Sequence, residues 1–227
     1  MHGASGDRRC PIHESANVAN MTETTNASAW PQPITLRDEH ATLLPLERGH
    51  RDGLAAAADD GQLWKLWYTT VTAPERMHDE IERRLRLQLQ GAMLPFTIVD
   101  NATGRIVGMT TYMNIDAANR RLEIGSTWYA RSVQRTAINT ECKRLLLTHA
   151  FEQLACVAVE LRTSVFNRQS RQAIERLGAK LDGILRNHMR HPDGTLRDTC
   201  VYSIIAGEWP AVKANLDWLI ARPRQRD

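Results

Sequence analysis

A strand, a long helix and a second strand follow one another without interruption near the middle of the chain, and this run constrains the fold most. RRLEIGSTWYA predicts a strand from Arg120 to about Tyr129. SVQRTAINTECKRLLLTHAF carries apolar residues at helical spacing and predicts a helix from about Ala137 to Leu154. CVAVELRTSV alternates apolar and polar residues, which indicates another strand. We expect these two strands to run parallel, because a hairpin cannot join strands across a helical crossover.

The segments on either side predict antiparallel strands and further helices. ATLLPLERGH, from Ala41, indicates a first strand, RDGLAAAADD a helix, and PERMHDEIERRLRLQLQG an amphipathic helix that opens at Pro74 and ends at Gly91. LPFTIVDNATGRIVGMTTYMNI indicates two strands joined at DNATG. A helix from Asn167 to Leu177, a hairpin across PDGT and a last helix in EWPAVKANLDWLI follow. The expected fold is of the α/β (α+β) class, with a mixed, mostly antiparallel sheet of about seven strands flanked by helices.

Composition along the chain predicts one globular domain between two polar ends. Residues 1–32 are rich in Ser, Thr, Asn and Ala and lack an apolar signal-peptide core, so we expect a disordered leader. The globular domain is predicted to span 33–220, and 221–227 forms a basic tail.

The charges and cysteines exclude several classes of function. The net charge is +3 and the basic residues are scattered, which argues against a nucleic-acid partner. No apolar run reaches the length of a membrane span, so no membrane partner is expected. Cys10, Cys142, Cys156 and Cys200 lie far apart without CxxC spacing. We therefore expect reduced, mostly buried thiols in a cytoplasmic protein, and no metal site.

The start of the central helix is a candidate anion site. A helix that follows a strand presents free backbone N–H groups in its first turn, and these groups together with the helix dipole attract phosphate. The segment contains no glycine, but Thr136, Ala137 and Asn139 are small or polar, and Arg135 and Lys143 are nearby cations. The alternative is an ordinary helix with polar caps. Asn167 has a similar alternative, because asparagine is a good N-cap in its own right.

At this point the chain resembles the GNAT acetyltransferase superfamily, in particular its RimJ/RimL-like branch. Three motifs carry the resemblance in the family's order, over about Ala41 to Trp218: RRLEIGSTWY followed by QRTAINTE, then FNRQSRQAIERLGAKLDG, then TCVYSIIAGEW. Two departures stand out. Ala137 and Asn139 replace the small residues of the family's phosphate motif, and Ile174 stands where many members carry a tyrosine acid.

The resemblance implies acetyl-coenzyme A as co-substrate, bound where the two middle parallel strands splay apart. Backbone N–H groups near Thr127 to Tyr129 are expected to polarise the thioester. The residues implied to contact the coenzyme are Thr127, Trp128, Tyr129, Gln134, Arg135, Thr136, Ala137, Ile138, Asn139, Thr140, Asn167, Ser170 and Arg171.

Candidate catalytic and acceptor residues follow from the same resemblance. Glu123 is the candidate base, acting through water; its alternative is an exposed strand carboxylate or a structural ion pair. Ser170 is the candidate acid near the leaving sulfur; its alternative is a coenzyme contact or a polar residue of the first helical turn. Trp64, Trp67 and Tyr68 are expected to form a wall of the acceptor pocket, although clustered aromatics are more often core.

The predicted function is transfer of an acetyl group to a primary amine, of a protein N-terminus or of a small molecule, by direct attack in a ternary complex. The alternative is a coenzyme-binding or scaffold protein of the same fold that has lost catalysis. A monomer or a homodimer is expected.

Overall fold

The computed structural model describes residues 30–191 and 193–222. The predicted leader therefore lies outside the described residues except for its last three positions, and the predicted tail except for its first two. Trp30, the first described residue, packs against the core, and the guanidinium carbon of Arg120 lies 5.5 Å from the centre of its ring.

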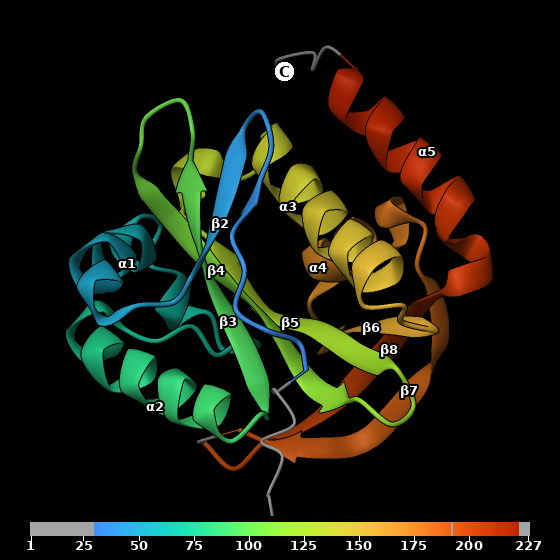
Figure 1. The fold of residues 1–227 in the computed structure, drawn as a ribbon. Helices are drawn as coiled ribbons and strands as arrows, with labels where there is room; N and C mark the ends of the chain where they lie inside the picture. The colour runs from blue at the N-terminus through green and yellow to red at the C-terminus, as the bar shows by residue number, and fades with distance from the viewer. Residues whose placement is uncertain (1–29, 192, 223–227) are drawn as a thin grey trace, which may run out of the picture.

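In the described parts of the chain, eight strands form a single sheet in the order β1-β2-β3-β4-β5-β6-β8-β7 (Figure 1). All neighbouring strands are antiparallel except β5 and β6, which are parallel. The strands are β1 (Leu36–Arg37), β2 (Ala41–Pro45), β3 (Met93–Asp100), β4 (Ile106–Asp116), β5 (Arg121–Tyr129), β6 (Ala158–Ser164), β7 (Lys180–Arg190) and β8 (Leu196–Ile205).

Within the described residues, five α-helices surround the sheet. They are α1 (Arg51–Asp59), α2 (Met77–Leu89), α3 (Ala137–Thr148), α4 (Arg168–Leu177) and α5 (Trp209–Ala221). A π-helical turn, His149–Gln153, continues α3, and short 3-10 helices lie at Arg48–His50, Leu63–Lys65, Pro74–Arg76, Arg131–Val133 and Ala206–Glu208.

The predicted class, the mostly antiparallel sheet and its central parallel pair are confirmed. The expected count of about seven strands missed β1, whose two residues are too few to show any periodicity. The amphipathic helix predicted from Pro74 starts as a 3-10 turn with that proline at its first position, and its α-helical part begins at Met77.

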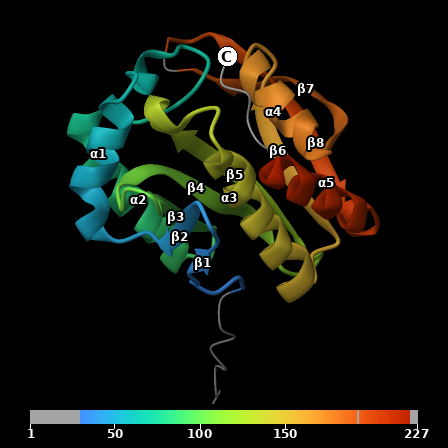
Figure 2. The same ribbon diagram turned by 90° about the horizontal axis from the view of Figure 1, so that it is seen from above.

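The helices cover the two faces of the sheet separately. Figures 1 and 2 show α1 and α2 together on one side, and α3, α4 and α5 on the other. Six consecutive residues of β3, Met93 to Ile98, are buried, as expected for a strand covered on both faces. Three described cysteines, Cys142, Cys156 and Cys200, are free and buried, as predicted, whereas Cys10 lies outside the described residues.

Helix α3 is tied to the sheet at both of its flanks. The hydroxyl of Tyr112 on β4 donates to the Leu146 carbonyl at 2.5 Å. On the other flank the fully buried carboxylate of Glu141 accepts hydrogen bonds from the backbone N–H groups of His40 and Ala41, both at 2.7 Å. Arg144, on the same helix, forms an ion pair with Asp38. These contacts fix where the first turn of α3 stands.

The parallel ladder between β5 and β6 is short and ends at the register pair Glu123 and Glu160. Beyond this pair β5 stays paired with β4 as far as Tyr129, and β6 stays paired with β8 as far as Ser164. Each strand therefore follows its outer neighbour, and the two separate. The register of β4 with β5 shifts between Met109 and Thr111, next to Ser126 at a left-handed φ of 48°. Such a bulge adds local twist and directs β5 away from β6.

The contact between β4 and β5 at the open end depends on Gly108. A Cβ atom at this position would overlap the backbone carbonyl of Trp128, which has no freedom to move within a paired strand. Gly108→Ala should therefore lower the free energy of unfolding by about 1–3 kcal/mol, the range typical of overpacking. Urea unfolding followed by circular dichroism measures the change. Gly183→Ala on β7 is the matched control, because no atom lies within 4 Å of its added methyl. Equal stability of the two variants would contradict the assignment.

Candidate active site

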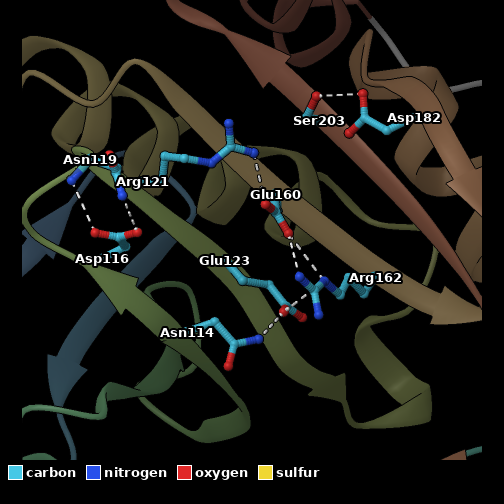
Figure 3. Close-up of polar contacts among 9 residues, drawn as sticks. All are labelled: Asn114, Asp116, Asn119, Arg121, Glu123, Glu160, Arg162, Asp182 and Ser203. Atoms are coloured by element: carbon cyan, nitrogen blue, oxygen red, sulfur yellow. Dashed lines mark hydrogen bonds and ion pairs between the residues drawn. The ribbon is translucent and has the colours of Figure 1, made fainter. Parts of the chain in front are cut away.

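Glu123 stands where β5 and β6 part and belongs to a continuous chain of charged and polar groups. Its Oε2 accepts a hydrogen bond from Asn114 Nδ2 at 2.6 Å and lies 3.4 Å from Nε of Arg162. Nη2 of Arg162 reaches Glu160 Oε2 at 2.7 Å, and Arg121 reaches the other oxygen of Glu160 at 2.8 Å. Figure 3 shows the whole chain, from Asn114 on β4 across β5 to Arg162 on β6.

The surroundings of Glu123 and Glu160 shift the pKa values of the two carboxylates in opposite directions. Burial raises the pKa of Glu123, which is 5 % exposed, although Arg162 and Asn114 hold part of that rise back. For Glu160 burial also acts upward, but hydrogen bonds from Arg121 and Arg162 outweigh it and the pKa is lowered. A pair of carboxylates separated in this way has one member that stays ionised and one that can take up a proton. Glu123 is the member whose pKa is raised.

Gly125, two residues along β5, leaves room for the Glu123 carboxylate. A Cβ atom at Gly125 would lie 2.7 Å from Glu123 Oε1 and 2.6 Å from the sulfur of Met113. The carboxylate therefore folds back along its own strand, over a position without a side chain.

The first turn of α3 lies beyond the end of β5 and has a polar cap. Thr136 is the N-cap and accepts from the backbone N–H of Ile138 at 3.4 Å. Gln134 donates to the Tyr129 carbonyl at 3.1 Å and so joins this turn to the end of β5. Ala137 and Asn139 are partly exposed, whereas the side chains of Ile138 and Thr140 are buried, which leaves their backbone for any ligand contact. Arg135 precedes the cap with a left-handed φ of 64°.

The end of β5 carries Thr127, Trp128 and Tyr129, on the stretch of the strand that β6 does not pair. Thr127 Oγ1 lies 2.7 Å from the hydroxyl of Thr110 and accepts from Nζ of Lys143 on α3 at 2.9 Å. Lys143 is itself buried, and burial lowers its pKa to about 8. Trp128 and the hydroxyl of Tyr129 are also buried, so this stretch offers a ligand its backbone rather than its side chains.

The predicted residues of α4 divide between capping and anchoring. Asn167 caps the helix, since its Oδ1 accepts from the backbone N–H of Ser170 at 3.0 Å. Ser170 is partly exposed in the same first turn. Arg171 donates to the Tyr202 hydroxyl at 3.0 Å, so its guanidinium is held toward β8. Ile174 is buried in the core.

Three distant segments meet at Trp67, in the connection between α1 and α2. Its ring centre lies 5.7 Å from that of Tyr68, 5.5 Å from Phe166 before α4, and 6.4 Å from His191 on the hairpin of β7 and β8. Trp67 is 60 % exposed and Phe166 63 %, so this cluster is a surface feature and not core. Trp64 does not share these ring contacts; Nζ of Lys65 lies 5.0 Å from its ring centre.

Sequence reasoning missed several residues that the fold brings to this region. Asn114, Glu160 and Arg162 reach Glu123 only through strand register, and Phe166 and His191 reach Trp67 only through tertiary packing. Among the described residues no group of three or more His, Cys, Asp or Glu side chains is placed to hold a metal ion. None of the helices within 30–191 and 193–222 is long and apolar enough to cross a membrane.

Comparison with known proteins identifies the family. The family described as "Acetyltransferase (GNAT) domain" matches residues 40–180. The chain belongs to this family. Its resemblance to the GNAT superfamily is thus confirmed, with proteins of the ribosomal N-acetyltransferase type among its relatives.

One curated relative is the "Putative ribosomal N-acetyltransferase YdaF" of Bacillus subtilis (strain 168), 34% identical over 110 residues. That match covers 48% of this chain and 59% of YdaF, so the chain spans less than two thirds of this relative.

Two solved structures show the same arrangement of the GNAT domain. A GCN5-related N-acetyltransferase from Brucella melitensis superposes with a TM-score of 0.75 at 28% identity, covering 84% of this chain and 87% of that one. RimJ of Mycobacterium smegmatis, in complex with CoA-disulfide, superposes with a TM-score of 0.69 at 24% identity, covering 84% and 96%. At 24% identity, the similarity to RimJ shows a shared fold only.

Arg162 is the nearest cation to Glu123, and its removal should shift the protonation of Glu123. Arg162→Met removes a charge that favours the carboxylate, so the pKa of Glu123 should rise further. If Glu123 acts as a base, activity appears as pH rises through that pKa. The acid limb of the kcat/KM profile should therefore move up by about one pH unit, the lower end for a charge within about 4 Å.

Arg162→Lys keeps the charge and is the matched control for this shift. If the acid limb of the kcat/KM profile does not move in Arg162→Met, a group other than Glu123 determines that limb.

Proposed function

We propose that the protein transfers an acetyl group from acetyl-coenzyme A to the N-terminal amine of a protein, by direct attack in a ternary complex. The observation that carries the proposal is the separation of β5 and β6 immediately beyond Glu123, with the first turn of α3 beyond the end of β5. A thioester within that opening has exposed strand backbone on one side and a carboxylate at the point where the strands part.

The coenzyme would be held mainly by backbone groups. The first-turn N–H groups of α3 and the helix dipole suit its pyrophosphate. Ala137 permits a close approach, and the partly exposed amide of Asn139 is a further donor. RimJ, which has the same fold, is a protein described in complex with a coenzyme A derivative. The backbone N–H groups of β5 between Ser126 and Tyr129 that point away from β4, toward the opening, would polarise the thioester carbonyl as it becomes tetrahedral.

Glu123 would accept the proton that the amine must lose, directly or through one water. Its raised pKa brings its proton affinity closer to that of the proton donor, which is the condition for efficient general-base catalysis. Glu160 stays ionised and holds Arg162 in place. The guanidinium of Arg162 therefore keeps a fixed position beside Glu123.

No covalent intermediate on the protein is needed. Burial raises the pKa of Cys142 to about 12 and that of Cys156 to about 11, so neither thiol supplies a thiolate nucleophile. Ser170 is the proposed donor to the leaving sulfur, since its side chain is partly exposed in the first turn of α4 and Ile174 has no proton to give.

The acceptor would reach Glu123 past the exposed cluster of Trp67, Tyr68, Phe166 and His191. YdaF carries a ribosomal N-acetyltransferase name, which supports a protein as acceptor and the cytoplasm as the place of reaction. An exposed aromatic cluster suits a peptide with a free N-terminus, because aromatic rings supply contact area at low conformational-entropy cost.

The placement of the coenzyme is tested by Ala137→Glu. A carboxylate at this position adds bulk and a like charge against the pyrophosphate, so affinity for coenzyme A should fall at least tenfold in isothermal titration calorimetry. An acidic residue at a helix N-terminus favours the free helix, so the melting temperature should not drop. Ala137→Ser is the small, uncharged control and should bind normally. Normal binding by Ala137→Glu would refute the placement.

The reaction itself is tested by measuring the coenzyme A thiol released from acetyl-coenzyme A in the presence of amidated peptides. Both sets of peptides contain a lysine; one set has a free N-terminus and the other has a blocked N-terminus. Only the first set should react. Glu123→Gln keeps the shape and the Asn114 contact and should lower turnover about 10²–10⁴-fold, the usual effect of removing a general base. Asp182→Asn removes an exposed carboxylate on the same face of the sheet and should leave turnover unchanged. Coenzyme binding without turnover on any amine would instead support a binding or scaffold protein.

A further inference from the structure

The face of the sheet that carries Glu123 holds one arginine, Arg197, without an ion pair among the described residues. Residues 197, 199, 201 and 203 of β8 alternate onto this face, because Val201 is the register partner of Arg162 and Ser203 that of Glu160. Arg121 and Arg162 form ion pairs with Glu160 and Glu123. Arg197 is the third arginine, and it has no ion pair within 4 Å among the described residues.

The charge of Arg197 has no carboxylate partner at ion-pair distance among the described residues. Its Nε is buried and has no hydrogen-bond partner within the described parts of the chain. The neighbouring carboxylate, Asp198, is engaged by Nε of Arg186 at 2.5 Å and by the backbone N–H of Asn187 at 2.8 Å. Burial lowers the pKa of Arg197, and the attraction of Glu123 offsets part of this. An arginine nevertheless remains protonated in proteins, so a positive charge persists beside the candidate base.

Arg197 also lies on the hairpin that contributes to the aromatic cluster. Its register partner is Met189 on β7, and His191, near the tip of the same hairpin, contacts Trp67. Arg197, which is half-buried, therefore lies both on the face of the sheet that carries Glu123 and on the hairpin that contacts Trp67. A guanidinium presents its N–H donors in a planar fork that matches a carboxylate.

We infer that Arg197 binds a carboxylate of the acceptor, close to the amine that is acetylated. The inference rests on the proposed function and narrows its acceptor class. Two sources share this chemistry: an acidic side chain just after the N-terminal residue of a protein, and the α-carboxylate of a free amino acid. In both, the amine faces Glu123 while the carboxylate fills the unused donors of Arg197. An uncharged acceptor would leave those donors without a hydrogen-bond partner. The resulting loss of binding free energy would make the site select acceptors that carry a carboxylate.

The test uses two pairs of acceptors that differ only in one carboxylate. The first pair is an amidated peptide beginning Ala-Glu and its Ala-Gln counterpart, and the second is alanine and alaninamide. The deciding quantity is the ratio of kcat/KM between the wild type and Arg197→Gln for each acceptor, because the different basicity of the amines cancels in that ratio. For the carboxylated member of the reacting pair, Arg197→Gln should lower kcat/KM about ten- to a hundredfold, mainly by raising KM. For the neutral member, kcat/KM should change little.

Two further variants separate a direct contact from other effects. Arg190→Gln removes an exposed charge from the same hairpin and should change both members of a pair equally and slightly. Arg197→Glu should favour a peptide beginning Ala-Lys over Ala-Glu.

The outcomes distinguish this inference from the proposed function. Reaction with alanine but with neither peptide would remove the protein acceptor and leave the carboxylate contact in place. Equal loss by Arg197→Gln on carboxylated and neutral acceptors would overturn the inference and make Arg197 a support for Glu123. Wild-type enzyme that shows no preference within either pair would overturn it as well.

Discussion

The structure depends on the point at which the β5–β6 ladder stops. Glu123 and Glu160 are the last paired residues, and beyond them each strand is held by its outer neighbour, β4 or β8. Since both outer ladders continue, the opening exists without any ligand to force it. The candidate base lies at its closed end, and the first turns of α3 and α4 follow the two strands at its open end. A site of this kind requires no rearrangement of the sheet when a coenzyme enters.

Charge pairing then gives the two carboxylates at that point different tasks. Glu160 is bound by two arginines and stays ionised, whereas Glu123 has one amide donor, one more distant guanidinium and little exposure to water. Identical functional groups on adjacent strands thus acquire opposite proton affinities from their neighbours alone. Gly125 also shapes the site, because the Glu123 carboxylate can fold back along β5 only where no side chain occupies position 125.

The sequence predicted most of the fold but only part of this site. The central crossover, the end of α4 at Gly178 and the cap at Asn167 depend on periodicity and local backbone chemistry, which are legible in a single chain. Strand β1 was missed because two residues show no period. Asn114 and Arg162 were missed because their approach to Glu123 depends on strand register, and bulges shift that register. The contact of Trp67 with His191 joins residues more than half the chain apart and has no local signature.

Glu141 has a consequence for how the chain folds. Its carboxylate reaches back to the amides of His40 and Ala41, 101 and 100 positions earlier in the sequence. A buried carboxylate without those donors is costly, so α3 cannot settle until the turn before β2 is in place, and the turn gains this anchor only when α3 arrives. Contacts over such separations are typical of topologies that fold slowly. The helix that would hold the coenzyme and the N-terminal edge of the sheet thus stabilise each other across this separation. A fragment that ends before residue 141 would leave both unfinished.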